Sequence, residues 1–118
     1  MMGWFGTRNA APGAVAADEV RQGLGQTGAP TILDVRTASE FLGDGHIPGA
    51  IHLPLDRLAQ DLRSLDPGAE YVLVCRSGAR SAQAQRVLAS AGFARTKNMS
   101  GGMLRWHGPV VHDGPARR

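Results

Sequence analysis

The sequence has a single cysteine, few aromatic residues and no long apolar run. One cysteine among 118 residues excludes an intrachain disulfide and a redox cycle between two cysteines of this chain. It favours a reducing compartment, most simply the cytoplasm. No apolar stretch approaches the roughly 20 residues that a membrane helix needs. The first residues also lack the basic start and sustained apolar stretch of a secretory signal. We therefore expect a cytoplasmic protein with no membrane partner.

Charge is also sparse and evenly spread. The formal net charge is only +3, and aromatic residues make up 5% of the chain. The basic residues are mostly arginines without a dense cluster or interleaved aromatics, so nucleic acid is disfavoured as a partner and small anions are favoured. The apolar fraction of 42% and the length fit one globular domain with one core.

Patterns typical of strands alternate with patterns typical of helices. Short apolar runs predict strands at 31–35, 51–53, 71–74 and 96–99. Apolar residues at helical spacing predict helices at 18–24, 55–65 and 81–91, and a short one carrying Leu104 and Trp106. Residues 1–13 predict a flexible N-terminal segment and 109–118 a C-terminal tail. This order predicts an α/β fold with a mainly parallel central sheet and helices on both faces.

The only cysteine lies in the most informative segment, Cys75-Arg76-Ser77-Gly78-Ala79-Arg80. This loop follows the predicted strand at 71–74 and precedes a helical pattern that begins at Ser81. Backbone N–H groups and the positive end of a helix dipole therefore point at the thiol. Such a cysteine is expected to ionise easily and to be nucleophilic. A buried structural cysteine is the alternative, and the two loop arginines with Gly78 favour the reactive one.

Asp34 lies at the end of the predicted strand at 31–35, and Arg36 follows that strand. They belong to the same carboxyl edge of the sheet as the cysteine loop, where reactive loops gather. If the next segment is helical, Arg36 can pair with Glu40 four residues later. We expect a salt bridge that organises the site instead of a direct catalytic role. Ser81 either caps the helix after the loop or reaches toward a bound anion.

The four histidines do not predict a metal centre. His46 and His52 lack a third and a fourth ligand at a recognisable spacing, so we expect His46 to be a hydrogen-bonding loop residue. His107 and His112 lie near the C-terminus, where we expect no partner for them. Trp106 is expected in the core. The sequence implies neither a metal nor an organic cofactor.

Four short motifs follow one another along the chain. They are Leu33-Asp34-Val35-Arg36 with Glu40-Phe41, Gly45-His46-Ile47-Pro48-Gly49-Ala50 with Leu53-Pro54, Cys75-Arg76-Ser77-Gly78-Ala79-Arg80-Ser81, and Gly101-Gly102 with Trp106. In order and spacing they resemble the rhodanese family, over about residues 14–108. The resemblance implies a single rhodanese-like domain whose cysteine accepts a sulfane sulfur from a donor such as thiosulfate. The resulting persulfide then passes its sulfur to cyanide or another thiophilic acceptor.

The resemblance makes Cys75 the nucleophile and the sulfur carrier. Thiosulfate is a compact dianion, and Arg76 and Arg80 can supply positive charge and directional hydrogen bonds to it. A solvated face is the alternative for these arginines. Gly78 permits the backbone conformation that turns successive N–H groups inward. The expected binding residues are Arg76, Ser77, Gly78, Ala79, Arg80 and Ser81.

Three other functions remain open at this point. A cysteine phosphatase is the first, because one phosphatase family shares the fold. Its loop places five residues between cysteine and arginine, whereas four separate Cys75 from Arg80 here, and the shorter ring suits a small sulfur species better. A non-catalytic binding module is the second. A persulfide carrier that serves a protein partner is the third, and the sequence does not separate it from an enzyme acting on small thiols.

Overall fold

The computed structural model describes residues 13–116. Of the expected flexible segment at 1–13, all but Gly13 lie outside these residues. Gly13 itself is bonded to the fold, because its carbonyl accepts hydrogen bonds from the Asn98 N–H and from the Gln85 side chain, each over 2.9 Å. Among residues 13–116, no helix is long and apolar enough to cross a membrane.

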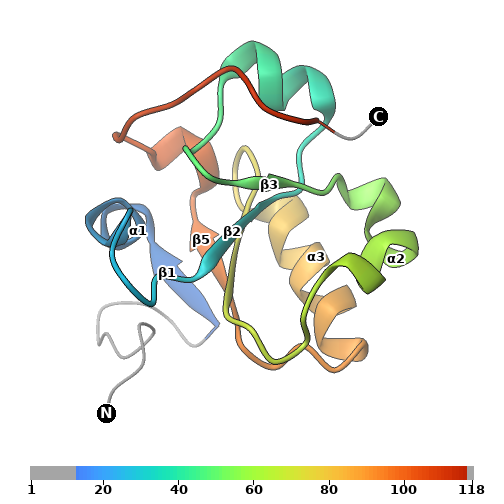
Figure 1. The fold of residues 1–118 in the computed structure, drawn as a ribbon. Helices are drawn as coiled ribbons and strands as arrows, with labels where there is room; N and C mark the ends of the chain where they lie inside the picture. Colours follow the sequence, from blue (N-terminus) through green and yellow to red (C-terminus); the bar gives the residue numbers. More distant parts are fainter. Residues whose placement is uncertain (1–12, 117–118) are drawn as a thin grey trace.

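Five parallel strands form one sheet, in the order β1-β5-β4-β2-β3 (Figure 1). Their bounds are Ala14–Ala16 for β1, Thr31–Asp34 for β2, Ile51–His52 for β3, Tyr71–Val74 for β4 and Thr96–Ser100 for β5. The four predicted strands are confirmed: the one at 71–74 agrees at both ends, and each of the other three differs by one residue at its C-terminal end. The predicted α/β fold with a parallel sheet is confirmed as well.

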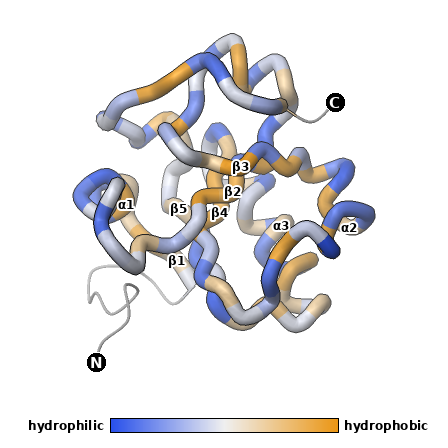
Figure 2. Tube along the Cα trace, viewed as in Figure 1, coloured by the Kyte–Doolittle hydropathy of each residue, from blue (hydrophilic) through white to orange (hydrophobic). Residues whose placement is uncertain are grey.

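Each face of the sheet carries its own apolar cluster, as the alternation of side chains along strands requires. One face packs Leu73 and Cys75 against α2 (Leu58–Asp61) and α3 (Ala79–Ser90). The other face packs Val72 and Val74 against α1 (Ala17–Gly23) and Trp106. Figure 1 shows α1 on one side of the sheet and α2 and α3 on the other, and Figure 2 shows the apolar residues gathered along the strands between them. Helices on both faces are thereby confirmed.

The predicted single helix at 55–65 is wrong. This stretch is a 3-10 turn, η2 (Leu55–Arg57), followed by α2 and by a second 3-10 turn, η3 (Leu62–Ser64). Leucines three and four residues apart fall on one side of either helix type. The apolar spacing therefore indicated which side faces the core, but not how tightly the chain is wound.

Strand β1 was not predicted. It is a three-residue edge strand, Ala-Val-Ala, that pairs with β5 through Val15 and Met99. Alanine has little preference for strands, and one valine gives no alternation to detect. The strand exists because β5 offers a free edge, which is a property of the assembled sheet.

Candidate active site

Cys75 follows the last residue of β4 and is fully buried. Its sulfur accepts a hydrogen bond from the Gly78 N–H, with 3.0 Å between nitrogen and sulfur, and lies 3.3 Å from the Ser81 hydroxyl oxygen. The loop then enters α3 at Ala79, with Gly78 as the N-cap. The thiol therefore lies at the N-terminal end of a twelve-residue helix, where a negative charge is favoured.

These contacts lower the pKa of the Cys75 thiol below its ordinary value. Burial alone raises it, but the hydrogen bond from the Ser81 side chain acts in the opposite direction. Backbone N–H groups of Ser81, Gly78 and Ser77 add to that lowering and outweigh the burial. The predicted easily ionised cysteine thus has a physical cause in the described structure, since a larger share of thiolate makes a better nucleophile at neutral pH.

Two glycines allow the loop to close around the sulfur. Gly78 has a φ of +101°, a left-handed conformation that costs little only for glycine. Gly102 lies behind the loop, where a Cβ atom would come within 2.4 Å of the Cys75 carbonyl oxygen. Its closeness lets the Met103 N–H donate to that carbonyl over 2.9 Å. A supporting 3-10 turn, η4 (Gly102–Arg105), therefore touches the cysteine loop directly.

Ser81 does not cap α3, whose N-cap is Gly78 without a side-chain bond. Its buried hydroxyl instead reaches the sulfur and also lies 2.5 Å from the Asn98 side-chain oxygen. The Asn98 amide nitrogen donates to the Gly78 carbonyl over 3.0 Å, which fixes its oxygen toward Ser81. The hydroxyl has one hydrogen, so it donates to only one of three acceptors at a time: the Asn98 oxygen, the sulfur, or the Gly78 carbonyl at 3.2 Å. Asn98 was missed because it lies inside β5, where the sequence has no signal of a site.

Arg80 pairs with Glu40. Its two terminal nitrogens donate to the two carboxylate oxygens over 2.7 and 2.8 Å. Glu40 also accepts hydrogen bonds from the N–H and the hydroxyl of Thr37, each over 3.1 Å, as in a capping box. The hydrogen bonds from the Arg80 side chain lower the pKa of Glu40 most, burial raises it, and Thr37 adds to the lowering, so the pKa comes to about 2. The π-helical turn η1 (Glu40–Asp44) is thus tied to the cysteine loop.

The predicted pair between Arg36 and Glu40 is wrong. Arg36 turns back to Asp34, and its guanidinium donates to both carboxylate oxygens over 2.7 to 3.1 Å. Both residues are buried, and Arg36 also donates to the Gly45 carbonyl over 2.8 Å. Glu40 pairs with Arg80 instead, and Arg36 pairs with the carboxylate two residues before it. A salt bridge that organises this edge of the sheet does exist, but within the strand end itself.

Arg76, Ser77 and Ala79 are exposed on the outer side of the loop. Arg76 borders a hollow of about 250 Å³ that Arg36 and Trp106 also line. Among residues 13–116, Arg76 has no ion pair, in contrast to Arg80. The outer side of the loop therefore presents an uncompensated positive charge.

The remaining expectations concern histidines and Trp106. His46 is a hydrogen-bonding loop residue as predicted, with Nδ1 2.7 Å from the Phe41 carbonyl, and Trp106 is in the core at 8% exposure. The expectation that His112 has no partner is wrong, because its Nδ1 lies 2.9 Å from the Leu42 carbonyl. Residues 109–116 run back along η1, so this contact depends on the folded chain. Within the described part of the chain, no three metal-ligating side chains gather.

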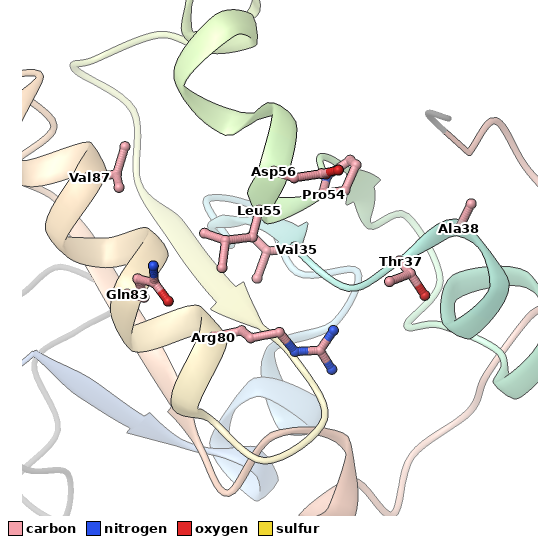
Figure 3. A pocket seen from close by; sticks show the side chains of 9 residues that line it. All are labelled: Val35, Thr37, Ala38, Pro54, Leu55, Asp56, Arg80, Gln83 and Val87. Atoms are coloured by element: carbon pink, nitrogen blue, oxygen red, sulfur yellow. The ribbon is translucent and has the colours of Figure 1, made fainter.

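An open pocket of about 640 Å³ lies beside the loop, between the end of β2, the segment 54–56 and the first turns of α3. Figure 3 shows Val35 and Leu55 side by side at its centre and the Arg80 guanidinium reaching toward Thr37. The full lining is Val35, Thr37, Ala38, Pro54, Leu55, Asp56, Arg80, Gln83 and Val87.

The sequence and the fold of this chain match a known family and several known proteins. Residues 16–109 match the family described as Rhodanese-like domain. A sulfurtransferase of Allochromatium vinosum is 34% identical over 100 residues, which cover 82% of this chain and 92% of that protein. Thiosulfate sulfurtransferase GlpE of Shewanella oneidensis is 34% identical over 76 residues, 64% of this chain and 74% of that protein. A rhodanese-like domain protein of Staphylococcus aureus superposes with a TM-score of 0.79 at 30% identity, covering 86% of this chain and 98% of that structure.

Proposed function

This chain belongs to the family of rhodanese-like domains, a family with sulfurtransferase members, and we propose that it moves a sulfane sulfur through a persulfide on Cys75. The observation that carries the proposal is the buried Cys75 sulfur, 3.0 Å from the Gly78 nitrogen and 3.3 Å from the Ser81 hydroxyl oxygen. These donors suit a negatively charged sulfur. They stabilise the thiolate before the reaction and the anionic persulfide after it.

In the first half of the cycle, the Cys75 thiolate attacks the outer sulfur of thiosulfate. A bond forms between Sγ and that sulfur, the S–S bond of thiosulfate breaks, and its electron pair leaves with sulfite. We assign the attraction of the dianionic donor to Arg76, whose charge is uncompensated on the outer side of the loop. Arg80 keeps free N–H groups beyond those bound to Glu40, and we propose that it orients the donor and the loop together.

In the second half, a thiophilic acceptor such as cyanide attacks the outer sulfur of the persulfide. The new bond forms to the acceptor, the S–S bond to Sγ breaks, and Cys75 returns as a thiolate. No proton, metal or electron carrier is needed, so the residues of the loop are sufficient for this cycle. Ser81 can donate its hydroxyl hydrogen to Sγ whenever the sulfur carries the charge and return it to Asn98 otherwise. The thiosulfate preference is supported by the likeness to a thiosulfate sulfurtransferase at 34% identity.

The test is the formation of thiocyanate from thiosulfate and cyanide. We expect turnover by the wild type and none by Cys75→Ser, because a hydroxyl is a far poorer acceptor of sulfur than a thiolate. An aryl phosphate in the same buffer should stay intact, since the loop encloses a smaller ring than a phosphate requires. Thiocyanate formation at the wild-type rate by Cys75→Ser, or Cys75-dependent release of phosphate, would overturn the proposal.

A further inference from the structure

The pocket beside the Cys75 loop has an apolar floor. Val35 and Leu55 lie at its centre, and Val87 closes one end (Figure 3). Arg80, Gln83 and Val87 are spaced i, i+3 and i+7 on α3, so they line the pocket from one face of the helix. A volume of about 640 Å³ falls within the range of pockets that take small organic molecules. Thiosulfate and cyanide, which have no apolar part, leave this floor unused.

The same floor belongs to the face of the sheet that carries the cysteine. Val35 and Cys75 are members of one apolar cluster, against which Leu55 and Val87 pack. Arg80, in the first turn of α3 directly after the cysteine loop, forms part of the pocket wall. A molecule that lies on Val35 and Leu55 is therefore next to the loop and on the same side of the sheet as Sγ.

The charges of the pocket differ from those of the loop's outer side. The guanidinium of Arg80 is offset by Glu40, 2.7 Å away. Asp56 lines the opposite rim, is exposed, and has no ion pair among the described residues. A dianion gains little here. An uncharged or cationic organic molecule fits both the apolar floor and the Asp56 carboxylate.

We propose that this pocket is the acceptor subsite and that it takes a small aliphatic thiol, uncharged or carrying an ammonium group. The carbon chain lies on Val35, Leu55 and Val87, and the ammonium group lies beside Asp56. The sulfur of the acceptor thiol forms a bond to the outer sulfur of the anionic persulfide while the thiol proton moves to that outer sulfur, and the bond to Sγ breaks with its electron pair going to Sγ. The acceptor leaves as an alkyl persulfide that keeps the proton, and Cys75 is again a thiolate. The inference rests on the proposed persulfide cycle.

The experiment begins with protein loaded by thiosulfate and freed of excess donor, with the added sulfur verified by intact mass. Loss of that sulfur is then timed with three thiols of similar size: cysteamine, mercaptoethanol and mercaptopropionate. For each thiol, the rate of sulfur loss from a variant is divided by the rate of sulfur loss from the wild type. Differences in the intrinsic reactivity of the three thiols cancel in these ratios. The variants are Asp56→Asn and, as a charge-matched control on α1 far from the pocket, Asp18→Asn.

Relative to mercaptoethanol, we expect Asp56→Asn to slow cysteamine about threefold and to speed mercaptopropionate about threefold, the size usual for one exposed charge pair. Both effects should shrink with added salt. Asp18→Asn should change none of the three ratios. If Asp56→Asn leaves all three ratios at the control value, the ammonium-selective rim is wrong.

Chain length tests the apolar floor. Mercaptobutanol should drain the sulfur faster than mercaptoethanol, by up to about fourfold for each methylene that is fully buried. Val87→Thr keeps the side-chain shape but makes it polar, and should reduce this advantage while the melting temperature stays near wild type. Equal rates for both thiols in the wild type would overturn the subsite. A protein that never gains sulfur would instead overturn the proposed function itself.

Discussion

The two arginines of the Cys75 loop have opposite surroundings. Arg80 has 35% of its side chain exposed and is held by Glu40 through two hydrogen bonds. Arg76 is exposed and has no ion pair within residues 13–116. The loop is therefore two-sided, with uncompensated charge at Arg76 and an apolar pocket next to Arg80. A single carboxylate from another segment thus gives different electrostatic surroundings to two arginines that lie four residues apart in one motif.

A change behind the loop should disable both sides at once and give the largest effect. In Gly102→Ala the new Cβ would meet the Cys75 and Arg76 carbonyl oxygens at 2.4 and 2.5 Å, so the loop must shift. Loss of one preorganised donor lowers turnover by about a hundredfold or more in comparable sites. We expect a fall of that size in kcat for thiocyanate formation.

Gly49→Ala is the matched control for that variant. Gly49 also has a positive φ, +83°, but no atom lies within 4 Å of its missing Cβ. Gly49→Ala should therefore lose about 1 kcal/mol of folding stability through backbone strain. The turnover of the protein should stay at the wild-type value. An equal loss of turnover in both variants would show that strain in general, and not the closeness of Gly102 to the loop, is responsible.

Replacement of each arginine by alanine should change a different steady-state parameter. Arg76→Ala is expected to raise KM for thiosulfate about tenfold, the effect of losing one hydrogen bond to a charged group, and to flatten the dependence of KM on salt. Arg80→Ala should lower kcat more than it raises KM and should keep most of the salt dependence, since Glu40 already offsets its charge. If Arg80→Ala abolishes the salt dependence and Arg76→Ala does not, the roles assigned to the two sides must be exchanged.

The rate of sulfur loading should follow the ionisation of Cys75. Because hydrogen bonds hold the pKa of Cys75 below its ordinary value, loading should reach its plateau at a lower pH than the alkylation of a free thiol. Ser81→Ala removes the hydrogen bond that lowers the pKa of Cys75 most. In this variant the pKa of Cys75 should therefore rise, and the whole profile of loading rate should move to higher pH. The measurement is the loading rate against pH for both proteins. Coincident profiles would show that the Ser81 hydroxyl does not stabilise the thiolate.

The smallest expected effect is on stability. The folded-state pKa of Glu40, about 2, lies below its ordinary value of 4.5. The pair with Arg80 therefore stabilises the fold fully above pH 4.5, and the contribution is lost as the pH falls toward 2. We expect Glu40→Gln to cost about 1 kcal/mol in urea unfolding at neutral pH, since the pair is partly exposed. The difference from wild type should disappear in acid, and a constant difference down to pH 2 would contradict the pairing.

Much of the fold was predictable because buried parallel strands leave a strong local mark. Runs such as 71–74 are apolar at every position, as a strand covered on both faces requires. The errors arose where the local pattern is ambiguous or absent. Leucine spacing at 55–65 fits two helix types, and β1 has no pattern of its own.

The site was predictable to the extent that its residues are neighbours in the sequence. Cys75, Gly78 and Ser81 lie in one loop and the first turn of α3, and they do meet at the sulfur. The partner of Arg80 was not predictable, since Glu40 is forty residues away. The need for a glycine at position 102 was not predictable either, because it arises where this segment packs against the cysteine loop. Such contacts are set by the packing of the finished sheet.

Intact mass after exposure to thiosulfate tests the central claim most directly. After removal of excess donor, the wild-type chain should be heavier by one sulfur atom, and cyanide should remove that mass and release an equal amount of thiocyanate. Cys75→Ser should gain nothing while keeping its melting temperature. A folded wild-type protein that never gains the sulfur, or a Cys75→Ser chain that does, would contradict the persulfide cycle on Cys75.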